Sequence, residues 1–113
     1  MSRPIDTDHL ERYVAGDDAL RDEILTIFHE QVDLLRSRMD INASDDEWHD
    51  VMHAMKGASR GVGAWEVGDL CEKAETYIKE CEDKQVKREA VVADLKVKLD
   101  EVIADADALR DGK

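Results

Sequence analysis

The sequence predicts an all-α protein, an antiparallel up-down-up-down four-helix bundle with a short extra N-terminal helix. The composition favours helix, because the 113 residues include only one Pro and six Gly. Four long segments repeat apolar residues at the three-and-four spacing of amphipathic helices. Short connections between these segments imply that consecutive helices are antiparallel neighbours. A chain of this length fits one domain, residues 1–113, around a single core.

The first two helices are predicted from their stop and start signals. A short helix near residues 7–14 ends at Gly16, and Asp17 can cap a second helix that runs to about Ile41. The apolar side chains of the short helix are Leu10, Tyr13 and Val14. The apolar stripe expected to be buried on the second helix is Leu20, Ile24, Ile27, Phe28, Leu34 and Leu35.

The third helix opens at a capping box, in which Ser44 and Glu47 have the S-x-x-E spacing. Its apolar face consists of Trp48, Val51, Met52, Met55, Ser59 and Val62. The opposite face carries His49, His53, Lys56, Gly57 and Arg60. We therefore expect His53 to point away from the core. Gly61 and Gly63 end this helix.

Two further helices complete the bundle. The fourth is expected from Ala64 to about Glu82, with Glu75 at the edge of its buried stripe, and the fifth follows Asp83. The buried stripe of the fourth is Val67, Leu70, Cys71, Ala74 and Ile78. The apolar residues of the fifth are Val92, Leu95, Leu99, Val102, Ile103, Ala106 and Leu109.

Charge, hydropathy and cysteine content indicate the kind of partner, the location and the state of the thiols. A formal charge of −12 repels phosphate backbones and anionic lipid surfaces, so we expect a protein partner, with no nucleic acid and no membrane. Residues 1–6 lack the apolar run of a secretory signal, and no stretch approaches the ~20 apolar residues that span a bilayer, which favours a cytoplasmic protein. On one helix, Cys71 and Cys81 would be separated by roughly 15 Å, so both thiols are expected to be reduced.

One motif carries most of the functional information. Residues 53–57 read H-A-M-K-G, residues 62–64 read V-G-A, and residues 67–75 read V-x-x-L-C-x-x-A-E. This run resembles the signature of the histidine-containing phosphotransfer family of bacterial two-component phosphorelays. That signature is H-x-[Leu/Met]-K-G, then an apolar residue and Gly, then L-x-x-L-C-x-x-L-E. The start of the second helix and the order of five helices also resemble the family, so the likeness covers nearly the whole chain.

The residues of the motif suit phosphoryl transfer on chemical grounds. An exposed histidine is largely neutral at physiological pH, so His53 can attack phosphorus through a ring nitrogen. Lys56, one turn later, can offset the phosphate charge, an attraction worth at most ~4 kcal/mol at a surface, and Arg60 follows a further turn on. Gly57 costs a helix about 1 kcal/mol relative to Ala, and we expect its purpose to be clearance for a docking partner. The plainer interpretation of both cations is a solvated helix surface.

The resemblance implies the rest of the site and the reaction. Glu75 stands where the family has a Gln or Glu that accepts a hydrogen bond from the imidazole, which leaves Nε2 as the nucleophile. A receiver aspartate would donate the phosphoryl group to His53, and a second receiver aspartate would take it. The implied partners are response-regulator receivers, including those of hybrid histidine kinases, which dock on His49, Gly57 and Arg60 of the third helix and on the start of the second helix. The domain would act as a monomer, with no cofactor of its own, because the receiver supplies Mg²⁺.

Other functions remain as alternatives. His49 and His53 are four residues apart, a spacing used by paired metal ligands, and Glu75 could add a carboxylate. Position 50 is Asp, so the H-E-x-x-H motif is absent. The chain also lacks G-x-x-x-x-G-K-[ST], so ATP-dependent kinase activity is not expected. A helical adaptor that binds receiver-like partners without chemistry is the other alternative.

Overall fold

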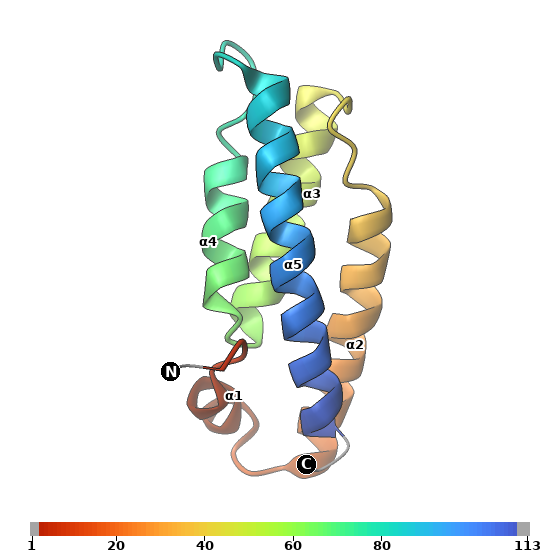
Figure 1. The fold of residues 1–113 in the computed structure, drawn as a ribbon. Helices are drawn as coiled ribbons and strands as arrows, with labels where there is room; N and C mark the ends of the chain where they lie inside the picture. The colour runs from red at the N-terminus through yellow and green to blue at the C-terminus, as the bar shows by residue number, and fades with distance from the viewer. Residues whose placement is uncertain (1–2, 111–113) are drawn as a thin grey trace.

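The structure is a computed structural model that describes residues 3–110, and these residues form five helices and no strand. The helices are α1 (Thr7–Val14), α2 (Asp18–Ser37), α3 (Asp45–Gly61), α4 (Trp65–Ala74) and α5 (Lys84–Arg110). Figure 1 shows α2 to α5 running alternately up and down, with α1 lying across the lower end. Each long helix packs against its neighbours in the chain, and α5 closes the ring against α2. The predicted all-α bundle with a short extra helix is confirmed.

The core receives apolar side chains from all five helices. The predicted buried face of α3 is confirmed, and Ser44 caps this helix by accepting a hydrogen bond from the Glu47 amide at 3.2 Å. The largest fully buried apolar side chains are Ile5, Leu10, Leu25, Val32, Trp48, Val51, Met52, Met55, Val67, Leu95 and Leu99. None of the helices in residues 3–110 is both long enough and apolar enough to cross a membrane.

The buried stripe predicted for α2 is partly wrong. The residues of α2 that are buried are Leu25, Phe28, Val32 and Leu35. Leu20, Ile27 and Leu34 were expected among them, but they are 38%, 54% and 60% exposed. Two apolar stripes run along α2 at helical spacing, and only contact with the other helices decides which one enters the core. The second stripe is left on the surface.

Two helices end earlier than the sequence predicts. The predicted end of α2 near Ile41 is wrong, because the last turn is closed at Ser37, whose hydroxyl donates to the Leu34 carbonyl at 2.6 Å. The predicted end of α4 near Glu82 is wrong by about two turns, since α4 stops at Ala74. Cys81 therefore lies outside α4, so the two cysteines are not held apart along one helix as predicted, although both are free thiols.

Side-chain donors from other helices explain the early end of α4. The indole Nε1 of Trp48 donates to the Ala74 carbonyl at 2.8 Å, and Arg88 Nε donates to the Tyr77 carbonyl at 2.9 Å. Carbonyls at a helix end need partners, and here distant donors supply them instead of a continued helix. Arg88 is 1% exposed and lies 4.6 Å from the centre of the Trp48 ring. These contacts fix where the chain leaves α4, directly before Glu75.

Candidate functional site

His53 stands on the exposed face of α3, as predicted, with its side chain 65% exposed. Its Nδ1 atom lies 3.2 Å from Oε2 of Glu75. A carboxylate accepts hydrogen bonds and cannot donate them when ionised, so this contact favours the tautomer with the proton on Nδ1. In that tautomer Nε2 carries the lone pair, on the side of the ring turned away from Glu75. This arrangement leaves Nε2 chemically able to act as a nucleophile.

Glu75 is the residue directly after α4, and its side chain is only 12% exposed. It reaches α3 because Trp48, which is 1% exposed, holds the preceding Ala74 carbonyl. An ideal helical wheel places His53 some way from the fourth helix, whereas the structure brings the two side chains into contact. Glu75 therefore lies beside His53, and its role in orienting the ring stays a prediction.

Lys56 lies one turn after His53 and also faces Glu75. Its Nζ atom is 2.6 Å and 3.1 Å from the two carboxylate oxygens. Burial pushes the pKa of Glu75 upward, but the hydrogen bonds from Lys56 and His53 outweigh it and hold the pKa below its ordinary value. Glu75 is thus an anion at neutral pH, and the ammonium of Lys56 is paired with it.

His49 stacks on His53, with ring centroids 5.8 Å apart and planes 11° from parallel. Its Nε2 atom is 3.9 Å from the same Oε2 of Glu75. Lone pairs in nearly parallel rings do not converge on one point, as two ligands of a metal ion must. Residues 3–110 contain no group of three or more side chains placed to hold a metal ion. The arrangement does not support the metal-binding alternative.

The structure separates the other two predicted docking residues. A Cβ built on Gly57 would meet nothing within 4 Å, so packing inside the protein does not require glycine there. Arg60 instead points to α4, where its Nη2 atom lies 3.3 Å from Asp69 and 3.2 Å from Glu72. Its aliphatic part fills the space above Gly68, where an added Cβ would lie 2.7 Å from Arg60 Cγ. Gly57 therefore faces open space, whereas Arg60 is engaged at the seam between α3 and α4.

A shallow groove of about 200 Å³ starts at Gly57 and runs between α1, α2 and α3. It is lined by Tyr13, Ile24, Ile27, Phe28, Gln31, Gly57, Ala58, Gly61 and Val62. Sequence reasoning missed this groove because it assigned Ile27 to the core. The second apolar stripe of α2 could have indicated the groove. A helix that buries one apolar stripe in the core leaves a second stripe exposed, where it can contact a partner.

Comparison with known proteins gives consistent matches. The model of the Hpt domain family matches residues 17–112. The crystal structure of the histidine phosphotransferase ShpA from Caulobacter crescentus is similar, with 34% sequence identity and a TM-score of 0.62. That likeness covers 97% of this chain and 99% of the ShpA chain. No curated protein sequence matches the chain.

Proposed function

The chain belongs to the Hpt domain family, whose members are phosphorelay intermediates, and from this premise we propose that His53 carries the phosphoryl group. The observation that carries the proposal is the contact between His53 Nδ1 and the Glu75 carboxylate at 3.2 Å. Among the described residues, this contact favours one tautomer of a histidine whose side chain is 65% exposed, and it leaves Nε2 as the unprotonated ring nitrogen.

The transfer follows from this geometry. Nε2 of His53 attacks the phosphorus of a receiver's aspartyl phosphate, a P–N bond forms, and the P–O bond to the aspartate breaks. The aspartate leaves as a carboxylate. The proton on Nδ1 stays in place, so the ring becomes positively charged, and the anionic Glu75 lies within hydrogen-bond distance of that charge. The reverse attack by another receiver aspartate returns the ring to its neutral form.

Lys56 has a supporting role in this proposal. Its ammonium contacts both oxygens of Glu75, so it keeps the carboxylate ionised and fixes its direction toward His53. Lys56 is 19% exposed and one turn from His53, close enough to lower the electrostatic cost of a phosphate on the ring. It acts mainly through Glu75.

Hpt domains interact with receiver domains, and we propose that the receiver docks over Gly57 and the groove beside it. Gly57 has no side chain to obstruct a receiver, and the groove supplies apolar contact area next to His53. The receiver would bring both the aspartyl phosphate and the Mg²⁺ ion. Monomeric action, a cytoplasmic location and receivers of hybrid kinases as partners stay predictions.

The test is transfer of ³²P from a panel of phosphorylated receivers in Mg²⁺ to the native chain, to His53→Gln and to His29→Gln. His29 is the matched control, since it is a histidine on α2 paired with Asp107 rather than with Glu75. We expect acid-labile label on the native chain and on His29→Gln, and none on folded His53→Gln. Label on His53→Gln would contradict the proposal. Stable receiver binding with no label on any chain would favour the adaptor alternative.

A further inference from the structure

The groove beside His53 has one wall that lies outside the part of the chain matched by the family model. Tyr13 belongs to α1, and the match begins at residue 17. The Tyr13 side chain is 67% exposed, the same as Val86 at the opposite end of the bundle. Unlike Val86, it borders the groove that also contains Gly57. A large aromatic residue thus stands exposed at the edge of the proposed docking surface.

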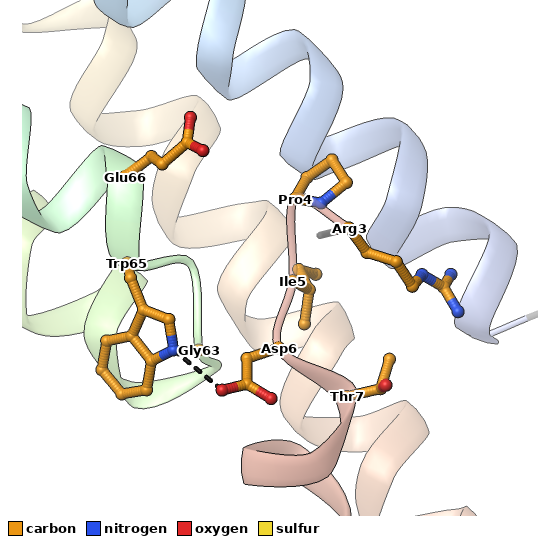
Figure 2. Close-up of a pocket in the computed structure, with 8 residues that line it drawn as sticks. All are labelled: Arg3, Pro4, Ile5, Asp6, Thr7, Gly63, Trp65 and Glu66. Carbon is orange, nitrogen blue, oxygen red and sulfur yellow. Dashed lines mark hydrogen bonds between the residues drawn. The ribbon is translucent and has the colours of Figure 1, made fainter. Parts of the chain in front are cut away.

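The position of α1 is held firmly by the segment that precedes it. Asp6 caps α1 by accepting from the His9 amide at 3.1 Å, and it accepts a second bond from Trp65 Nε1 at 3.0 Å. Figure 2 shows this second bond as the dashed line from the indole of Trp65 to the carboxylate of Asp6. The Asp6 amide donates to the Gly63 carbonyl at 2.9 Å.

Gly63 is what allows this close approach. Its φ of +87° is in the left-handed region, and an added Cβ would lie 3.0 Å from the Asp6 carbonyl oxygen. Ile5, Leu10 and Val14 are at most 2% exposed, so they anchor both the segment and α1 in the core. Tyr13 is therefore presented on a fixed support.

We propose that Tyr13 is a partner-selecting residue, which contacts an apolar ridge of the docked receiver and discriminates among receivers. This inference rests on the proposed function. Exposed aromatic rings at the edge of an apolar groove are typical anchors of protein interfaces, because they bury a large area and lose few rotamers. The same groove is lined by Gly57, one turn after His53, so a receiver that docks over Gly57 and fills the groove contacts the Tyr13 ring. Receivers that fit the ring gain affinity, and receivers that clash with it lose affinity.

The experiment measures KM and kcat for transfer from each receiver that labels the native chain, with Tyr13→Ala, Tyr13→Phe and Val86→Ala. We expect Tyr13→Ala to raise KM for the preferred receiver roughly tenfold, with kcat within about twofold of the native value. The KM values of the different receivers should therefore lie closer together than they do for the native chain. Tyr13→Phe keeps the ring and should keep the native KM. Val86→Ala should match the native chain throughout.

The outcomes separate this inference from the function on which it rests. A native chain that accepts no label from any receiver would contradict the proposed function itself. A labelled native chain whose KM values are all unchanged in Tyr13→Ala would overturn only the role of Tyr13. Loss of kcat at unchanged KM would also overturn it, because a selecting residue acts on binding. Thermal unfolding of each variant shows whether α1 stays in place, and Tyr13→Phe gives a comparison that leaves packing intact.

Discussion

The Nδ1 atom of His53 lies 3.2 Å from Oε2 of Glu75, although the two residues are 22 positions apart and belong to different parts of the bundle. The contact joins an exposed ring to a carboxylate that is mostly buried and already paired with Lys56. A buried acceptor with a fixed direction selects one tautomer of the ring. His29 also has a carboxylate, Asp107, 3.1 Å from its Nδ1 atom, but that ring is 27% exposed and its acceptor is 41% exposed, whereas His53 combines an exposed ring with a mostly buried acceptor.

Removal of the acceptor should slow transfer without removing the nucleophile. We expect Glu75→Ala to lower kcat roughly ten- to a hundredfold, the usual scale for loss of an orienting partner. Glu75→Gln should recover much of the rate, because an amide oxygen still accepts from Nδ1. Glu72→Ala is the matched control, since this acid lies on α4 but bonds to Arg60. Equal rates for Glu75→Ala and the native chain, measured with one phosphorylated receiver, would contradict the orienting role.

Acid should destabilise the native chain through Glu75. Its pKa in the folded protein is below its ordinary value of 4.5, because hydrogen bonds from Lys56 and His53 outweigh the effect of burial. A lowered pKa contributes stability that is present above the unfolded value and lost as the pH falls through the folded value. Urea unfolding between roughly pH 6 and pH 3 should therefore show a smaller loss of unfolding free energy in Glu75→Gln. If the free energy of unfolding depends on pH in the same way in the native chain and in Glu75→Gln, the ion pair between Glu75 and Lys56 does not contribute this stability.

The exposed face of α3 could be predicted from helical periodicity, whereas the contact between His53 and Glu75 was implied only by the family resemblance. Helical periodicity and the H-x-x-K-G pattern place His53 and Gly57 on one face, and the structure agrees. The contact to Glu75 depends on where α4 ends, and that end depends on Trp48 and Arg88, which donate to carbonyls distant in sequence. Local propensity carries no information about such donors. For the same reason, the sequence of α2 alone could not show which of its two apolar stripes is buried, because contact with the other helices decides this.

Gly57→Leu should separate stability from transfer. Leucine favours a helix over glycine by roughly 0.5–1 kcal/mol, and an added Cβ meets no atom within 4 Å, so the free energy of unfolding should rise slightly. Transfer from every receiver should fall sharply, because the side chain projects into the approach to His53. Gly57→Ala, with one carbon, should lie between the native chain and Gly57→Leu. A Gly57→Leu protein with native KM and kcat would show that receivers do not dock here.

The two cysteines should differ in reactivity. Burial, together with the nearby charge of Glu75, raises the pKa of the Cys71 thiol to about 12, so the reactive thiolate is scarce at neutral pH. Cys81 is partly exposed and lies outside the helices. Iodoacetamide should therefore modify the folded native chain at Cys81 and leave Cys81→Ser unlabelled, as read by peptide mass spectrometry. Cys71 should react only after denaturation, and its alkylation in the folded protein at the rate of Cys81 would contradict this.

Trp48 should matter both for stability and for the site. Its indole donates to the Ala74 carbonyl at 2.8 Å and packs beneath the Arg88 guanidinium. Trp48→Phe keeps an aromatic ring but leaves a buried carbonyl without this donor, which should lower the free energy of unfolding by about 1–3 kcal/mol. Transfer should also slow, because Glu75 follows directly on the released carbonyl.

Trp65→Phe is the comparison for Trp48→Phe, because Trp65 also donates from its indole, to Asp6, but its side chain is 41% exposed. Water can replace a donor at an exposed site, so the loss of stability should be smaller. The transfer rate at saturating receiver should stay near native, since Trp65 has no contact with Glu75 among the bonds described. Urea unfolding and single-turnover transfer measure the two effects separately. If both variants lose the same stability and both transfer at the native rate, the link from Trp48 through Ala74 to Glu75 does not position the site.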